Sequence, residues 1–152
     1  MKHVYLIPML AFTAMAAAAQ ETGSVTNVQD MKWEDGPPSV PKGGKMVVLH
    51  GDPSKDGTFS IRASLPAGYM VPPHFHSKDE HLTVLSGALY IGMSDVVDKK
   101  TAHALKAGGF HYLPGKVHHY AFTKAPTVLQ ISGDGPYDIN YLNPADDPRT
   151  KK

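Results

Sequence analysis

The composition of the chain is that of a single globular domain. Its 152 residues are enough to bury a hydrophobic core, and 41% hydrophobic with 19% charged residues is typical of a globular protein. Without the N-terminal segment that contains Lys2, 15 − 1 = 14 basic side chains balance 14 acidic ones, so charge gives no reason to expect nucleic acid or an anionic membrane as a partner. Because the chain has no cysteine, packing rather than disulfides must stabilise the fold.

Residues 1–19 have the pattern of a secretory signal peptide. Lys2 and His3 precede an apolar run from Val4 to Ala16, and the small residues of 17–19 offer a cleavage site before Gln20. The run is too short to span a bilayer comfortably, and no cysteine follows it that could carry a lipid. We therefore expect the mature protein to be soluble and exported, either secreted or periplasmic.

The segments that flank the predicted domain are irregular. Residues 20–45 are polar and then rich in proline and glycine, which indicates an N-terminal arm, and Trp33 is expected to pin this arm onto the domain. Residues 46–143 form the predicted domain. Residues 144–152 contain two prolines and many charges, which predicts an exposed C-terminal tail.

Short apolar runs separated by turn residues fill the middle of the chain. Thr58 to Leu65 alternates most cleanly, with Phe59 and Ile61 on one face and Ser60 and Arg62 on the other, as in an antiparallel sheet. Leu82–Leu85 and Ala88–Met93 are predicted to form a hairpin around Ser86-Gly87. The other predicted strands are 46–50, 104–105, 109–113, 120–123, 127–132 and 137–142. About nine short strands without a helical period predict an all-β sandwich or barrel.

The stretch from Gly68 to Gly87 carries a candidate metal site. His74 and His76 are two residues apart, so in an extended strand both imidazoles point to the same side. Glu80 follows four residues later. Two imidazoles beside a carboxylate suit a divalent first-row transition metal.

This stretch resembles the first motif of the cupin superfamily, G-x5-H-x-H-x3-E-x6-G, with all five fixed positions in register. The second cupin motif, G-x5-P-x-G-x2-H-x3-N, is matched at Gly108, Pro114 and His119. Lys116 stands where that motif has glycine, and Thr123 stands where it has asparagine. The segments GTFSIRASLPAGY and INYLNPADDPR also resemble small exported single-domain cupins whose reaction is unassigned.

The resemblance implies a jelly-roll β-barrel over residues 46–143. It also implies one metal ion held by His74, His76, Glu80 and His119, with iron, manganese, nickel, copper and zinc as candidates. His118 and His81 each neighbour one of these residues, and either could join or replace a ligand. A homodimer is a further expectation from the resemblance.

Other polar residues have two interpretations each. Arg62 and Gln130 are possible substrate contacts if their faces of the strands line the barrel, and otherwise lie on the outer, solvated face. His50, His103 and His111 have no partner at chelating spacing, so we expect them to be surface or core residues.

These features predict an exported metal-dependent enzyme that acts on a small organic molecule, as an oxygenase with Fe(II) or a similar ion. One alternative is a protein that binds a metal or small ligand without turnover, because a closed tetrahedral zinc site leaves no open position. The other is a metal-assisted isomerase or lyase that acts on a sugar acid.

Overall fold

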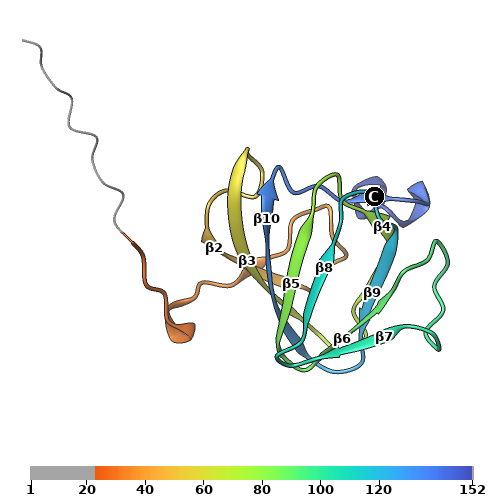
Figure 1. Cartoon of the computed structure of the whole chain (residues 1–152), viewed down its shortest axis with the longest axis horizontal. Helices are drawn as coiled ribbons and strands as arrows, with labels where there is room; N and C mark the ends of the chain where they lie inside the picture. The colour runs from red at the N-terminus through yellow and green to blue at the C-terminus, as the bar shows by residue number, and fades with distance from the viewer. Residues whose placement is uncertain (1–22, 152) are drawn as a thin grey trace, which may run out of the picture.

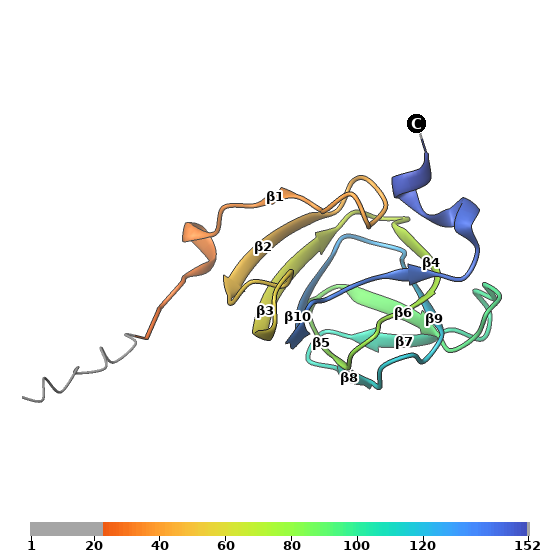
Figure 2. The same ribbon diagram turned by 90° about the horizontal axis from the view of Figure 1, so that it is seen from above.

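The computed structural model describes residues 23–151, which form two facing antiparallel β-sheets (Figures 1 and 2). The predicted signal peptide lies outside the described residues. The strands are β1 (Glu34–Asp35), β2 (Lys45–His50), β3 (Gly57–Leu65), β4 (Met70–Phe75), β5 (Glu80–Ser86), β6 (Ala88–Gly92), β7 (His103–Lys106), β8 (Phe110–Leu113), β9 (His119–Thr123), β10 (Thr127–Gly135) and β11 (Asn140–Tyr141). Three short 3-10 helices accompany them: η1 (Val28–Asp30), η2 (Pro144–Asp146) and η3 (Pro148–Thr150).

The chain passes repeatedly from one sheet to the other. The six-stranded sheet has the order β1-β2-β3-β10-β5-β8, and the five-stranded sheet has the order β11-β4-β9-β6-β7. From β3 onward, most consecutive strands therefore belong to different sheets, which is the connectivity of a jelly roll. The predicted all-β jelly-roll fold is confirmed, as two facing sheets.

The predicted hairpin between β5 and β6 is wrong. Strand β5 pairs with β10 and β8, whereas β6 pairs with β7 and β9 in the other sheet. Gly87 makes the turn between the sheets with a φ of 75°, and a Cβ there would lie 2.5 Å from the carbonyl oxygen of Pro126. Two apolar runs around a glycine are equally compatible with a hairpin within one sheet and with a turn that leads to the other sheet. The sequence pattern therefore could not distinguish these two arrangements.

The core lies between the sheets and follows the predicted alternation of β3. Phe59 and Ile61 are buried, and Ile61 pairs with Ile131 of β10 in the strand register. The core cluster also contains Leu82, Val84, Leu89, Ile91 and Leu129. On the opposite face of the same strand pair, the hydroxyls of Ser60 and Ser132 are 2.8 Å apart. The β3–β10 pair is therefore apolar on its inner face and polar at Ser60 and Ser132 on its outer face.

The N-terminal arm is attached to the domain by backbone pairing and by tyrosine hydroxyls. Strand β1 pairs with the start of β2. The hydroxyl of Tyr69 donates to the carbonyl oxygen of Pro41 at 2.5 Å, and that of Tyr141 donates to the carbonyl oxygen of Ser39 at 2.9 Å. Trp33 is partly buried. The N-terminal arm is thus held against the domain along its length from residue 34 to residue 45.

The C-terminal residues form two consecutive 3-10 turns. The side chains of Asn143 and Asp147 accept hydrogen bonds from backbone N–H groups at the starts of η2 and η3. Arg149 pairs with Asp147 and donates to the carbonyl oxygen of Ile139 at 3.2 Å, which ties this end to the domain. None of the helices within residues 23–151 has the length and hydrophobicity needed to cross a membrane.

Candidate metal centre

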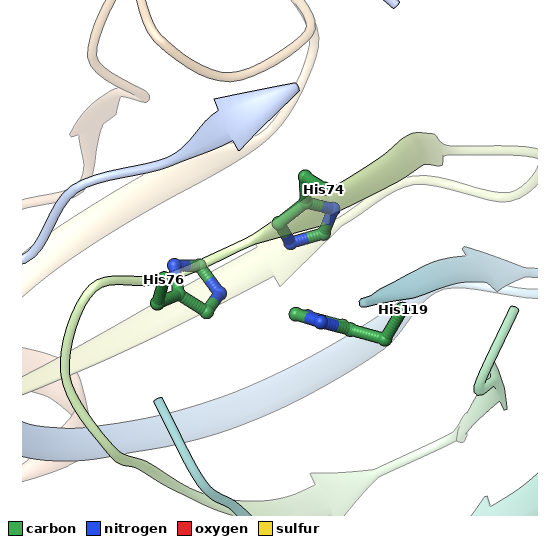
Figure 3. Close-up of side chains that lie close together, drawn as sticks. All are labelled: His74, His76 and His119. Carbon is green, nitrogen blue, oxygen red and sulfur yellow. The ribbon is translucent and has the colours of Figure 1, made fainter. Parts of the chain in front are cut away.

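Three histidines on or next to two neighbouring strands converge inside the jelly roll (Figure 3). His74 of β4 pairs directly with His119 of β9 in the strand register, and their ring centroids are 4.0 Å apart. The ring of His76, just after β4, lies 5.0 Å from that of His74 and 5.2 Å from that of His119. One nitrogen from each ring lies within 4.8 Å of the other two, and all three side chains are buried.

Backbone carbonyl groups fix the orientation of each ring. The Nδ1 atoms of His74, His76 and His119 lie 2.7, 2.5 and 3.1 Å from the carbonyl oxygens of residues 72, 138 and 117. A carbonyl oxygen can only accept, so each Nδ1 carries a hydrogen and donates it. In a neutral ring, the lone pair is then on Nε2 and available to a metal ion.

Burial keeps two of the rings neutral. Burial, together with the neighbouring charges of His119 and His76, lowers the pKa of His74 to about 3. Burial likewise lowers the pKa of His119 to about 4. At neutral pH these two imidazoles hold no extra proton that a metal ion would have to displace.

Glu80 lies beside the three-histidine cluster, next to His76. Its Oε2 is 3.2 Å from Nε2 of His76 and also accepts a short hydrogen bond from the hydroxyl of Tyr137. Burial alone would raise the pKa of Glu80, but the hydrogen bond and charge of His76 outweigh it and lower this pKa to about 2. Burial would also lower the pKa of His76, yet Glu80 raises it. The raised pKa of His76 and the lowered pKa of Glu80 both favour an ion pair between these two side chains.

The turn before β9 decides which of two adjacent histidines enters the cluster. Lys116, at the position where the cupin motif has glycine, has a φ of 68°, and its N–H donates to the carbonyl oxygen of His76 at 2.7 Å. The left-handed conformation is thus retained without glycine. His119 points inward, whereas the exposed His118 lies 2.8 Å from the carboxylate of Asp95.

The remaining candidates on the outer face stay outside the site. His81 is exposed and stacks on Tyr112 with ring centroids 5.3 Å apart. Arg62 donates to Gln130 at 3.2 Å across β3 and β10, on the opposite face from Ile61. Arg62 and Gln130 do not line the cavity that contains the histidines, because strand alternation directs their side chains to the outer face.

The histidine cluster opens onto a cavity of about 280 Å³ between the sheets. Its wall is mainly apolar and includes Ile61, Leu65, Val71, Leu89, Ile91 and Leu129. The arm contributes Gly36, Pro37, Ser39, Val40 and Gly44 to the wall. Lys45 is the only lysine or arginine of the described residues on this wall, and it forms an ion pair with Asp35.

Two residues of the site have no counterpart among the sequence-based candidates. The partly buried ring of Tyr137 stacks on His76, with centroids 4.7 Å apart and 22° between the planes. No spacing signal marks it, because it reaches the site from a distant connection. His111 lines the cavity, although the sequence predicted only a surface or core role. His111 lies two residues before the buried Leu113 in the same strand, so strand alternation places both side chains on the inner face, and the sequence could have indicated this.

Sequence comparison places the chain in a family. A family model described as "Domain of unknown function (DUF4437)" matches residues 16–140, more than half of the chain. The chain belongs to this family. No curated protein matches the sequence of this DUF4437 protein.

Solved structures share the fold of this DUF4437 protein. The polyketide cyclase RemF from Streptomyces resistomycificus is 17% identical, with a TM-score of 0.70 over 84% of this chain and 91% of its own. A putative acetylacetone dioxygenase from Methylibium petroleiphilum PM1 is 16% identical, with a TM-score of 0.67 over 88% and 90%. An RmlC-like cupin from Shewanella frigidimarina is 16% identical, with a TM-score of 0.56 over 72% and 87%. The resemblance to cupins seen in the sequence is confirmed.

The cluster of this DUF4437 protein fits a divalent transition metal. It offers three buried imidazole nitrogens, held by carbonyl groups, with a carboxylate beside them. Imidazole suits zinc, copper, iron and nickel, so the donor set is compatible with several ions. When bound, such an ion supplies Lewis-acid chemistry toward a substrate oxygen and, if it is iron, redox chemistry as well.

Proposed function

We propose that this protein is a metal-dependent enzyme of the oxygenase type that acts on a small, largely apolar ketone or 1,3-diketone. The observation that carries the proposal is the opening of three buried, carbonyl-anchored histidines onto an apolar cavity. His74, His76 and His119 hold the ion. Glu80 is the proposed fourth ligand, because its buried carboxylate lies 3.2 Å from Nε2 of His76, the atom that would bind the ion.

The wall of the cavity favours an apolar substrate over a sugar acid. A sugar acid needs a cation for its carboxylate and several hydrogen-bond partners for its hydroxyls. Along the described wall, the only lysine or arginine is Lys45, which already pairs with Asp35. A volume of about 280 Å³ is at the small end of ligand cavities. A compact ketone matches both the size and the apolar wall.

A structure with the same fold is named for chemistry on such a compound. The structure from Methylibium petroleiphilum, which shares only the fold, is named a putative acetylacetone dioxygenase. For a 1,3-diketone the proposed reaction takes up one dioxygen per molecule and breaks one carbon–carbon bond. The products are a carboxylic acid and a 2-oxoaldehyde, which between them contain both oxygen atoms of dioxygen.

The residues around the cluster have defined parts in this proposal. Tyr137 holds the Glu80 carboxylate toward His76, and the carbonyl group of residue 138 holds the His76 ring from the other side. The apolar wall excludes water from a bound ketone and thereby strengthens its polar interactions at the cluster. Binding and orientation thus come from the chain, and a bound ion completes the site.

Oxygen uptake tests this function directly. The protein is loaded anaerobically with Fe(II) and mixed with acetylacetone in aerated buffer, and both dioxygen and diketone are measured. We expect equal consumption of the two by the Fe(II) protein and none by the zinc-loaded protein. His103→Ala, at an exposed position on β7, should behave like the unchanged protein, whereas His76→Ala should be inactive. Tight metal binding without oxygen uptake would instead indicate a binding protein without turnover.

We also propose that the protein is exported. The support is the pattern of residues 1–19 alone. N-terminal sequencing of protein recovered from the periplasm or medium of an expressing bacterium should give a chain that begins at Gln20. An intact Met1 in the cytoplasmic fraction would contradict the proposal.

A further inference from the structure

His111 presents a buried nitrogen without a partner to the cavity. It lies on β8 between two exposed neighbours, Phe110 and Tyr112, so the alternation of the strand directs its ring inward. Its partner in the strand register is Leu82, a buried core residue of β5. Within residues 23–151, Nε2 of His111 is the only buried side-chain nitrogen or oxygen that lacks a hydrogen-bond partner.

Such an arrangement is costly for folding alone. A buried polar atom without a partner costs about 1–3 kcal/mol, and an apolar side chain of similar size would avoid that cost. The surrounding wall is mainly apolar, so leucine would suit the position better if packing were the only requirement. The unpaired nitrogen therefore points to a ligand that supplies the missing hydrogen bond.

His111 also lies near the candidate metal centre. Both His111 and His119 line the same cavity. Burial is the main cause of the lowered pKa of His119, and His111 makes a small contribution in the same direction, as expected for two rings on one cavity. A small molecule at the histidine cluster could therefore contact His111 as well.

We propose that His111 is a substrate-binding residue whose Nε2 forms a hydrogen bond with an oxygen of a bound 1,3-diketone. This inference rests on the proposed function for the class of ligand. The enol form of a 1,3-diketone has one O–H donor and one carbonyl acceptor, so it can pair with Nε2 in either tautomer of the imidazole. If one ligand oxygen lies at the histidine cluster, only a ligand with a second oxygen can also pair with His111, so His111 selects 1,3-diketones over simple ketones of the same size.

Equilibrium binding tests the inference without turnover. Acetylacetone is titrated calorimetrically into zinc-loaded protein, and 2-pentanone serves as a ligand of similar size with one oxygen. We expect His111→Leu to weaken acetylacetone binding about tenfold, the loss of one good hydrogen bond, and to leave 2-pentanone binding within about twofold. His111→Gln, which keeps a polar side chain, should recover part of the affinity. His103→Leu is the matched control and should bind like the unchanged protein.

Stability provides the second measurement. If His111 serves a ligand, His111→Leu should have a urea midpoint equal to or above that of the unchanged protein, with the same zinc content. A lower midpoint or lost zinc would show a structural role and overturn the inference. Undiminished acetylacetone binding by His111→Leu, or no binding by the unchanged protein, would also overturn it. Oxygen uptake by the Fe(II) protein is decided separately, so the two proposals can fail independently.

Discussion

His74 and His119 face each other across β4 and β9 as a directly paired set of residues, with ring centroids 4.0 Å apart. They are 45 positions apart in the chain (119 − 74). The register shift at residues 72–73 of β4 lies directly before His74. The ladder of hydrogen bonds between these strands therefore sets the spacing of two of the three candidate ligands.

Substitution of the two adjacent histidines should separate a ligand from its neighbour. His119→Ala removes a buried nitrogen from the cluster and should lower metal content to less than about a tenth of that of the unchanged protein. His118→Ala removes only an exposed contact with Asp95 and should leave metal content unchanged. Elemental analysis after dialysis measures both. Equal loss in the two variants would contradict the proposed ligand set.

Tyr137→Phe should destabilise the metal-free protein. The change removes the hydroxyl that donates to the buried Glu80 and keeps the ring stacked on His76. We expect the free energy of unfolding to fall by about 1–3 kcal/mol, because a buried carboxylate loses a donor.

Tyr112→Phe is the matched control for this measurement. Its hydroxyl donates to Asp79 at 2.8 Å, but this pair is exposed, so the expected loss is below about 0.5 kcal/mol. Urea unfolding gives both values. Similar losses in the two variants would show that the hydrogen bond to Glu80 contributes no more to stability than an exposed hydrogen bond.

The stability of the metal-free protein should fall as the pH drops from about 6.5 toward 4. The pKa values of His74 and His119, about 3 and 4, lie below the ordinary 6.5. Between these values the unfolded chain binds protons on these histidines and the folded protein does not, so protonation favours unfolding. Each of these histidines should cost about 1.4 kcal/mol per pH unit over this range. The pKa of Glu80, lowered to about 2, adds a further loss below about 4.5, the ordinary value.

His76 acts in the opposite direction. Its raised pKa favours the folded state below pH 6.5, and that contribution disappears as the pH rises through the folded value. Urea unfolding at pH 7, 6, 5 and 4 measures the balance. His74→Leu should reduce the slope by about half. A free energy of unfolding that stays constant from pH 7 to 4 would contradict burial of neutral imidazoles.

Lys116→Gly should stabilise the protein. A side chain in the left-handed conformation costs about 1–2 kcal/mol, whereas the greater freedom of glycine in the unfolded chain costs about 0.4–1 kcal/mol. We therefore expect a net gain of up to about 1 kcal/mol in urea unfolding. Lys116→Val, which is branched at Cβ, should lose stability at the same position. A gain with valine would show that the turn does not require this conformation.

Local spacing and the two motifs predicted which three histidines lie close together. A period of two brought His74 and His76 to one face, and the second motif indicated His119 rather than His118. The alternation of β3 predicted its buried face. These features depend on residues close together in the chain, where geometry limits the choices.

Contacts between segments that are distant in the chain could not be predicted from the sequence. Tyr137 reaches Glu80 from the far end of the chain, and no periodicity connects the two. The corner at Gly87 and the pairing of Arg62 with Gln130 on the outer face depend on which sheet each strand joins. A single sequence records apolar runs and turns, but leaves open which run pairs with which.

The attachment of the N-terminal arm has a consequence for how the cavity can vary. Tyr69 and Tyr141 hold the arm through backbone carbonyl oxygens of residues 41 and 39, which every amino acid provides. Val40, between these two anchor points, faces the cavity. Substitution of Val40 would change the shape of the cavity while both hydrogen bonds to the arm remain. The range of ligands that fit the cavity can therefore change without a loss of stability.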